Sequence, residues 1–544
     1  MLARALNTIH QGARQRPFLF LALVLAAMCL TMLDARALWF SDEVRYANAF
    51  QNFLDGHWVV LHLNGEMYPD KPPLYFGLLW LISLFTGGAT MPTFMLGAAV
   101  SGLFFLGATA WLARSVAGYG RETLLTAGIA LLGCFYFVGL THYSRMDLLF
   151  ASLILASQAL LFLGMRAKPT GFSWLALTGW LASALAVLTK GPLGFALPLA
   201  AIVVYLAWSG RLRRLFRLDT LVGLGLVILL VGGWLLGAWL VEGDAYVNNI
   251  LYKQVYRRAL DSWHHEHPFY HYLLTLPLVW LPWTALLACL PLKRLRDGGF
   301  WRGLWASRKN AGGPAFLWCS LLSGFVLLSS VHTKIVIYAL PLFAPLAILT
   351  ARGVLSLEGE RRKRFWTIVT GYFLLLALLV PLFEIFTPWP IPVGGTGLVL
   401  LCLAGTGALV RYASRLGTGP ALAAMAIGMV VTLQPIGLIT LPSLNPAMSP
   451  KATAEVMKDY VERGYEPAAH NTYAGIYTYY LGREYMETQD LEKIGQFVED
   501  NGKAVVAFKK KYWQRWEDKP ADMRVVFEQW IVDRPYVVAV TTEE

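Results

Sequence analysis

The strongest constraint on the fold is a series of about fourteen apolar runs that fill most of the first 441 residues. A bilayer core about 30 Å thick needs roughly 20 apolar residues in a helix. The runs are 17–38, 72–88, 92–113, 122–142, 146–166, 172–189, 191–208, 219–241, 271–290, 314–331, 334–353, 364–386, 394–411 and 418–441. Only 15% of residues are charged, against about 25% in soluble domains. The sequence therefore predicts a polytopic α-helical membrane protein.

The net charge of +12 resides mainly in loops between these runs, so it predicts topology and no nucleic-acid binding. Lys and Arg mark cytoplasmic loops of membrane proteins. The basic stretches are the N-terminus, 113–122, 165–171, 209–217, 292–310, 359–365 and 411–417. All of them fall on one side if the run 72–88 dips into the membrane and returns. We therefore expect thirteen spans, a re-entrant or juxtamembrane helix at 72–88, the N-terminus inside and the C-terminus outside.

This topology brings the unusual polar stretches of the chain to the opposite, outer side. These stretches are 41–46, 67–73, 142–147, 188–192, 254–272 and 332–338. Acids, bases and histidines at membrane depth are costly unless they are paired or used. The sequence thus predicts a shared extracytoplasmic pocket at the membrane surface.

The last hundred residues differ from the rest. Charge rises and the apolar spacing shortens, which predicts a helix near 450–464 and strands near 503–512, 523–530 and 535–541. We expect a transmembrane domain over 1–443 and a small soluble α/β domain over 444–544. Neither a G-x-G-x-x-G nor a Walker pattern occurs, so no nucleotide cofactor is expected.

The predicted pocket combines acids with an excess of cations. Arg and Lys suit phosphate oxygens, and a site at the membrane surface suits a lipid-linked ligand. A transferase outside the cytoplasm needs a donor activated beforehand, such as a polyprenyl phosphate sugar. The candidates are the carboxylates Asp42, Glu43, Asp70 and Asp147, the cations Arg45, Lys71, Arg145, Lys190, Arg257, Arg258 and Lys334, and the histidines His264, His265 and His267.

The order and spacing of these motifs resemble a known family. SDEVRY, MYPDKPP, SRMD, LTKGP, RRALD and HTKIVIY are similar to motifs of GT-C type glycosyltransferases, which include protein O-mannosyltransferases. The full set most resembles the lipid A 4-amino-4-deoxy-L-arabinose transferases. The resemblance implies a monomeric bacterial inner-membrane enzyme whose active site faces the periplasm. It would transfer aminoarabinose from undecaprenyl phosphate to a lipid A phosphate, with inversion, and so confer resistance to polymyxin.

The resemblance also implies roles for individual residues. It places the essential acid at Asp42, and Glu43 and Asp147 accompany it in the catalytic set. It places donor phosphate and lipid contacts at a group of cationic and phenolic side chains. These are Lys71, Arg257, Tyr338, Arg45, Tyr46, Tyr68 and Lys334. Members often have Glu where this chain has Asp70, so that residue keeps the charge with a shorter reach.

The role of Asp42 depends on the acceptor. A hydroxyl acceptor needs a general base, whereas a phosphate monoester, with a second pKa of about 6, is already a nucleophile at neutral pH. With lipid A phosphate as acceptor, Asp42 would orient it, stabilise positive charge at the sugar carbon, or bind a metal.

A divalent metal such as zinc is a further hypothesis. The stretch WHHEHPFYH offers imidazoles, and His265 with Asp70 are the ligands we single out. An interfacial loop rich in His is the alternative.

Structural alternatives also exist for the other sites. Lys71 could be an interfacial lysine, Arg257 could join a local ion-pair cluster, and Asp147 could form a structural pair with Lys190. Asp34, within the first run, could pair locally with Arg36, and we treat it as a structural residue.

Two other functions remain open from the sequence. One is the same class of enzyme with another acceptor, such as a protein or a different surface glycan. The other is a transporter or lipid flippase, although transporters usually have repeats and sites on broken helices at mid-membrane.

Overall fold

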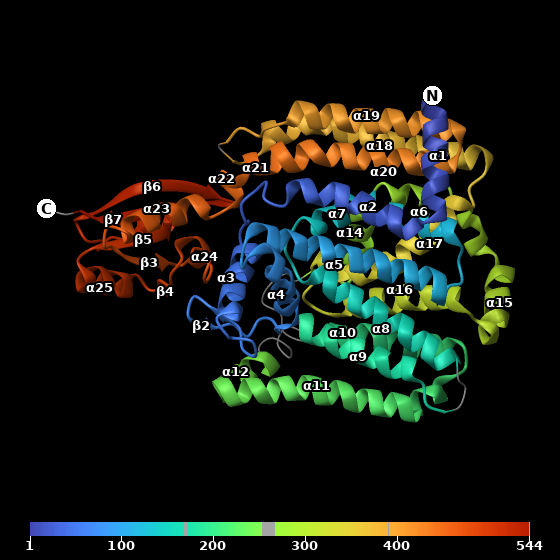
Figure 1. Ribbon diagram of the computed structural model, residues 1–544, viewed down its shortest axis with the longest axis horizontal. Helices are drawn as coiled ribbons and strands as arrows, with labels where there is room; N and C mark the ends of the chain where they lie inside the picture. Colours follow the sequence, from blue (N-terminus) through green and yellow to red (C-terminus); the bar gives the residue numbers. More distant parts are fainter. Residues whose placement is uncertain (168–170, 253–266, 390, 543–544) are drawn as a thin grey trace.

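The computed structural model describes residues 1–167, 171–252, 267–389 and 391–542. Most of them form a bundle of helices, and a small sheet lies beyond one end of it (Figure 1). Among the described residues, eight helical stretches are long and apolar enough to cross a membrane. They are α5 (Met91–Trp111) with η2 (Leu112–Val116), α8 (Asp147–Ala167), α11 (Leu218–Glu242), α16 (Gly313–Ser330), η8 (Val336–Leu342) with α17 (Phe343–Leu355), α18 (Gly359–Phe386), α19 (Thr396–Leu416), and α20 (Thr418–Pro435) with η9 (Ile436–Thr440) and α21 (Leu441–Ser443).

The other expected spans are shorter or bent. They are α2 (Pro17–Cys29) with η1 (Leu30–Met32), α6 (Arg121–Leu132) with α7 (Phe135–Thr141), α9 (Trp174–Lys190), α10 (Leu193–Trp208), and α14 (His271–Val279) with η5 (Trp283–Ala288). A break at Gly133 and Cys134 bends α6 against α7 by 77°. Each predicted apolar run therefore contains helix, and the predicted class of polytopic helical membrane protein with a small C-terminal sheet is confirmed.

The run at 72–88 forms α4 (Leu74–Thr86), a helix of 13 residues. At 1.5 Å per residue it is about 20 Å long, which is too short for a bilayer core of about 30 Å. The helix packs against α5, with Phe76 and Leu79 buried, whereas Leu84 and Phe85 are exposed. This length and burial fit the predicted juxtamembrane helix.

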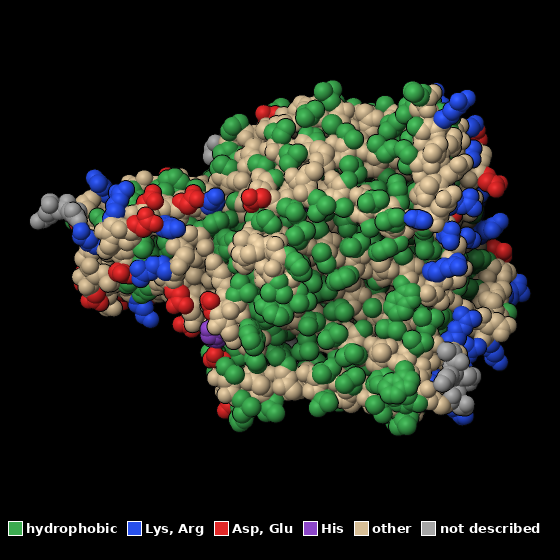
Figure 2. All heavy atoms as spheres, viewed as in Figure 1, with side chains coloured by type: hydrophobic (Ala, Val, Ile, Leu, Met, Phe, Trp, Pro, Cys, Tyr) green, Lys and Arg blue, Asp and Glu red, His purple; other side chains and the backbone are tan. Residues whose placement is uncertain are grey.

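Basic side chains gather at the end of the bundle away from the sheet (Figure 2). We call this the basic end, and the opposite end the sheet-facing end. Helix α1 (Leu2–Gln15) lies across the basic end, bent by 116° from α2. The short elements η3 (Leu212–Phe216), η6 (Leu292–Arg296), α15 (Gly298–Ser307) and η7 (Arg308–Asn310) belong to the basic loops between spans. The segregation of charge agrees with the loop assignment made from sequence.

The C-terminal sheet has five strands in the order β4-β3-β5-β7-β6. Its elements are α22 (Asn445–Met448), α23 (Lys451–Val461), β3 (Glu466–His470), α24 (Thr478–Leu481), β4 (Met486–Thr488), α25 (Leu491–Asn501), β5 (Ala504–Lys509), α26 (Lys510–Arg515), β6 (Met523–Ile531) and β7 (Arg534–Thr541). Strands β4, β3 and β5 are parallel, and β7 is antiparallel to both β5 and β6.

Alternate residues of the central strands serve two different cores, because successive side chains of a strand point to opposite faces. On β5, Val506 and Phe508 pack toward α25, whereas Val505 and Ala507 belong to the opposite core. That opposite core also contains residues of α23, α4 and α3 (Asp42–Leu54). The sheet therefore shares one hydrophobic core with α3, the helix that carries the acidic pair. The domain boundary near 443 stays a prediction.

The local pairing of Asp34 with Arg36 that the sequence allowed is not formed, because Arg36 pairs with Glu43. The first span ends at Met32, so Asp34 lies in the loop that follows, and its side chain is exposed. Arg36 instead turns inward to Glu43. A guanidinium buried this deeply needs a carboxylate that is buried with it.

Candidate active site at the sheet-facing end

The acidic pair of the first loop opens helix α3. Asp42 and Glu43 occupy its first turn, where the positive end of the helix dipole stabilises carboxylates. Although they are neighbours in sequence, their surroundings differ. The Asp42 side chain is 25% exposed, whereas Glu43 is completely buried.

Glu43 is saturated with protein partners. Its oxygens accept Nη1 and Nη2 of Arg36 at 2.7 and 2.8 Å, the backbone N–H of Ser144 at 2.7 Å and that of Trp39 at 2.9 Å. A carboxylate with four donors and no solvent contact has no room for a substrate. Its geometry is that of a residue that ties the first loop to the α7–α8 loop and so positions Asp42.

Asp42 begins a row of alternating charges. Nη1 of Arg145 lies 2.8 Å from Oδ2 of Asp42, and Nε of Arg145 lies 3.0 Å from Oδ2 of Asp147. The other oxygen of Asp147 pairs with Nζ of Lys190. Asp147 starts α8 and Lys190 ends α9, so each charge faces the favourable end of a helix dipole. The structural pairing of Asp147 with Lys190 raised from sequence is therefore present.

The row is graded in exposure. Asp147 is 3% exposed and Lys190 11%, whereas Asp42 and Arg145 are each close to one quarter exposed. Burial lowers the pKa of Arg145, but Asp147 and neighbouring groups raise it further, so Arg145 remains a cation. A solute can reach the Asp42–Arg145 end of the row, while the Asp147–Lys190 end anchors it.

The lysine end of the row meets one of the expected lipid-binding residues. Nζ of Lys190 lies 4.6 Å from the centre of the Tyr338 ring, a cation–π distance. Lys334, by contrast, is 5% exposed and donates to the carbonyl oxygens of Val331 and His267 at 2.6 and 2.9 Å. Because the Lys334 ammonium already donates to two backbone carbonyls, this geometry does not favour its predicted contact with a phosphate.

A second polar group surrounds Arg45. Its guanidinium lies 5.2 Å from the centre of the Tyr68 ring, and its buried Nε has no hydrogen-bond partner among the described residues. Burial lowers the pKa of Arg45, but Tyr68, Asp70 and Asp42 raise it more. Burial also raises the pKa of Tyr46 well above its ordinary value, so this phenol stays neutral. Lys71 is half-buried on the same loop as Asp70.

Four of the candidate residues, Arg257, Arg258, His264 and His265, lie outside the described residues. The proposed zinc ligand set therefore stays a prediction. Within the described ranges, no group of three or more His, Cys, Asp or Glu side chains is arranged to hold a metal ion. Asp70 is electrostatically coupled to Arg45, a pairing that the sequence did not predict.

The C-terminal part fixes the loop that leads into Asp42. The backbone N–H of Phe40 donates to the carbonyl of Met448 at 2.8 Å, and that of Leu38 donates to the Tyr480 hydroxyl at 2.8 Å. Oδ1 of Asn445 accepts the N–H of Ala37 and Nε1 of Trp39 at 3.2 and 3.0 Å. Sequence reasoning missed this role because the partners lie about 400 residues away.

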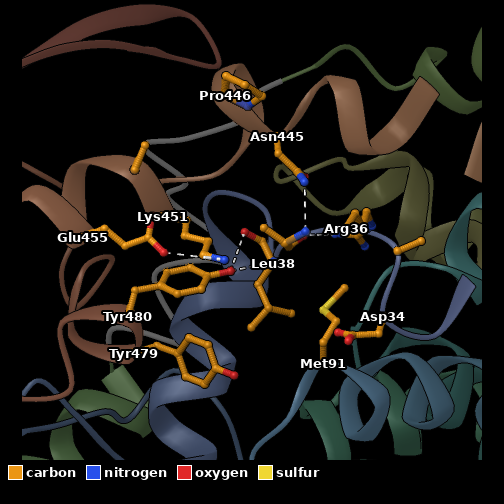
Figure 3. A pocket seen from close by; sticks show the side chains of 13 residues that line it. Asp34, Arg36, Leu38, Met91, Asn445, Pro446, Lys451, Glu455, Tyr479 and Tyr480 are labelled. Carbon is orange, nitrogen blue, oxygen red and sulfur yellow. Dashed lines mark hydrogen bonds and ion pairs between the residues drawn. The ribbon is translucent and has the colours of Figure 1, made fainter. Parts of the chain in front are cut away.

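A pocket of about 560 Å³ opens beside these contacts, between the first loop, α23 and α24 (Figure 3). Asp34, Lys451, Glu455 and the two tyrosines 479 and 480 line it. Asp42, Arg145 and Lys190 do not, so the pocket is separate from the row of charges. A smaller, mainly apolar cavity of about 260 Å³ lies between η1, α7 and η9, with Arg36 and Tyr143 in its lining.

Together, the helical bundle, the sheet-facing row of charges and the C-terminal sheet define a polytopic membrane protein with a charged site at one end of its bundle. Two named relatives are similar to this chain. The chain is 30% identical over 397 residues to the undecaprenyl phosphate-α-4-amino-4-deoxy-L-arabinose arabinosyl transferase of Edwardsiella ictaluri, covering 71% of this chain and 65% of that protein. It is 27% identical over 436 residues to the protein of the same name from Erwinia tasmaniensis, covering 78% and 75%. No family model matches the chain.

Solved structures extend the likeness to nearly the whole chain. The crystal structure of ArnT from Cupriavidus metallidurans bound to undecaprenyl phosphate superposes with a TM-score of 0.76 at 20% identity, over 96% of this chain and 97% of ArnT. The chain therefore has the ArnT fold, and the resemblance drawn from its motifs is confirmed. The alignment spans slightly less than two thirds of the Edwardsiella protein's own length.

Proposed function

We propose that this protein is an inverting glycosyltransferase that moves 4-amino-4-deoxy-L-arabinose from undecaprenyl phosphate to phosphate groups of lipid A. The observation that carries the proposal is the Asp42–Arg145–Asp147–Lys190 row at the sheet-facing end, ending beside Tyr338. It sets a reachable carboxylate and several cations together where a lipid-linked phosphate can arrive. The named relatives and the ArnT fold support the donor class.

The chemistry follows from the charges. In the proposed step, an oxygen of the acceptor phosphate attacks C1 of the sugar and the bond from C1 to the polyprenyl phosphate oxygen breaks. The acceptor is largely ionised, with a second pKa of about 6, so no base is needed to deprotonate it. Asp42 stabilises the positive charge that develops at the sugar carbon. One displacement inverts the anomeric centre.

The donor phosphate leaves as an anion, and the proposal assigns cations to receive it. Lys71 and Arg257 carry the charge, and the Tyr338 hydroxyl contributes a hydrogen bond. Arg45, whose Nε has no hydrogen-bond partner within the described ranges, extends this group together with its neighbours Tyr46 and Tyr68. Preorganised donors aimed at developing charge are usually the largest single contribution to catalysis. No nucleotide is involved.

We place the basic end in the cytoplasm and the sheet-facing end in the periplasm of a bacterial inner membrane. The gathering of Lys and Arg at the basic end supports this orientation (Figure 2). The partners are then the undecaprenyl phosphate-linked sugar, lipid A and the surrounding membrane lipid, and the protein acts as a monomer. The added amine lowers the negative charge of lipid A and weakens the binding of polymyxin and other cationic peptides.

The test is expression in a bacterial strain that lacks its own aminoarabinose transferase but makes the donor. We expect lipid A to gain the mass of one aminopentose for each modified phosphate, and polymyxin resistance to rise. If lipid A stays unmodified while a protein gains the sugar, the acceptor is a protein and not lipid A. Movement of the donor across vesicles without any glycosylated product would instead favour a transporter.

A further inference from the structure

Arg145 is shared between two carboxylates. It reaches Asp42 through Nη1 and Asp147 through Nε, at 2.8 and 3.0 Å. Asp147 also has Lys190 as a partner, whereas in the part of the chain that the structure describes Arg145 is the cation in direct contact with Asp42. Arg145 can therefore release Asp42 without leaving the buried Asp147 unpaired.

The exposure of the row points the same way. Asp147 is nearly inaccessible, so its bond to Arg145 holds the guanidinium in place. Asp42 and the outer part of Arg145 are partly exposed, so an incoming anion can reach the bond between them. The phenols of Tyr46 and Tyr143 also face Arg145 electrostatically and remain neutral because burial raises the pKa of both. Among these described neighbours, Asp42 and Asp147 are the negative charges that compete for Arg145.

We propose that Arg145 binds the phosphate of the acceptor, exchanging Asp42 for it when the acceptor arrives. The inference rests on the function proposed above and assigns the acceptor phosphate to a residue of this chain. A guanidinium offers two parallel N–H donors that match phosphate oxygens, and phosphate carries more charge than the carboxylate it replaces. Because Nε stays on Asp147, the phosphate is held at a fixed angle.

The exchange has a consequence for Asp42. While paired with Arg145, the Asp42 carboxylate is partly neutralised and is a poor stabiliser of a cationic sugar carbon. Once the acceptor phosphate takes the guanidinium, the full charge of Asp42 is free to face the sugar. Acceptor binding thus activates the carboxylate, and the reacting phosphate is placed beside it. Lys190, next to Tyr338, remains at the donor end of the row.

The experiment compares Arg145→Gln, Arg145→Lys and the control Arg411→Gln in the full-length purified protein. Arg411 donates to Thr367 and is exposed between α18 and α19, away from the row. Three quantities are measured: the acceptor KM and kcat with lipid A, the Kd for undecaprenyl phosphate, and the thermal unfolding midpoint. The Kd reports on the donor site alone, so it separates acceptor binding from general damage.

We expect Arg145→Gln to raise the acceptor KM by at least about tenfold, the scale of one lost charge-assisted contact. Arg145→Lys should keep a cation beside Asp147 and recover part of that loss. The Kd for undecaprenyl phosphate should stay within about twofold of the parent protein in both variants. An unchanged acceptor KM, or a weakened Kd for undecaprenyl phosphate in the still-folded lysine variant, would overturn the assignment of Arg145. A parent protein that binds undecaprenyl phosphate but modifies no lipid A would instead defeat the proposed function.

Discussion

The guanidinium of Arg36 donates a hydrogen bond to each carboxylate oxygen of Glu43, at 2.7 and 2.8 Å. Neither side chain is more than 4% exposed. Glu43 also accepts two backbone N–H groups, one from each of the loops that meet at the site. This pair is thus a structural junction beneath Asp42. In the proposed mechanism the adjacent Asp42 acts on the sugar, and Glu43 fixes the position of Asp42.

Replacing one partner of the Arg36–Glu43 pair should lower the free energy of unfolding far more than replacing both. Breaking a buried ion pair costs about 3–5 kcal/mol, whereas replacing both charges by apolar groups is often close to neutral. We expect Glu43→Ala to lower the free energy of unfolding by about that amount, and Arg36→Met with Glu43→Met together to restore most of it. Chemical or thermal unfolding in detergent measures this, with the exposed Glu455→Gln as control. Equal losses in the single and double variants would show that the pair is not coupled.

Asp42→Asn should remove catalysis and leave the fold intact. Its side chain is partly exposed and bonded to Arg145 rather than buried in the junction. We expect kcat to fall by about 100-fold or more, the scale of losing one preorganised electrostatic group. The thermal midpoint and the Kd for undecaprenyl phosphate should stay near those of the parent protein. Full turnover by the asparagine variant would contradict the role of Asp42.

Lys71→Ala should weaken donor binding. The residue lies half-buried in the loop between β2 (Glu66–Met67), which pairs with β1 (His62–Leu63), and α4. Loss of one charge-assisted phosphate contact should raise the Kd for undecaprenyl phosphate by about tenfold. Lys363→Ala, at the basic end, is the matched control, and fluorescence or calorimetric titration reads the Kd. Equal Kd values for both variants would show that Lys71 does not contact the donor phosphate and is an ordinary interfacial lysine.

Asn445→Ala should loosen the site from a distance. Its oxygen accepts two N–H groups from the loop that precedes Asp42, and the loss of a partner for buried donors costs about 1–3 kcal/mol. We expect kcat to fall more than donor affinity, because the loop aligns Asp42 and not the donor cations. The exposed Asn501→Ala, in α25, serves as control. A kcat equal to that of the control would mean that the C-terminal part does not set the geometry of Asp42.

His470 should make stability depend on pH. Strand β3 buries its ring, which is 1% exposed, and burial lowers its pKa below the ordinary 6.5. In the unfolded chain the His470 imidazole becomes protonated near pH 6.5, whereas in the folded chain it becomes protonated only at a lower pH. Unfolding takes up that proton, so the free energy of unfolding falls as the pH drops below 6.5. Thermal midpoints at about pH 7.5 and 5.5 should differ more in the parent protein than in His470→Gln. Parallel changes in both proteins would exclude this residue as the cause.

Much of the fold follows from local sequence, because a span is a contiguous apolar run and a basic loop is a contiguous cluster of charges. That α4 does not cross the membrane was predictable, because all the basic loops then fall on one side of the bilayer. Strands β5, β6 and β7 were visible as apolar, β-branched stretches. Strand β3, with the sequence EPAAH, was not, because Pro and Ala favour strands weakly and tertiary packing decides.

The site was predictable as a set of residues but not as a set of roles. Asp42 and Glu43 look alike in sequence, and only contacts with Arg36 and with Ser144, 101 residues away, make one structural and leave the other reachable. Arg145 and Lys190 were visible as cations of the outer pocket. Their ordering into one row with Asp147 depends on how α8 and α9 pack, which the spacing of residues along the chain does not reveal.

The most direct test of the central claim uses purified protein, synthetic undecaprenyl phosphate-linked aminoarabinose and lipid A in detergent. Mass spectrometry follows the lipid A, and Asp42→Asn is run beside the parent protein. The account predicts lipid A carrying one added aminopentose per modified phosphate, undecaprenyl phosphate released in equal amount, and neither product from the variant. Donor that stays intact with the parent protein, although it binds, would contradict the claim.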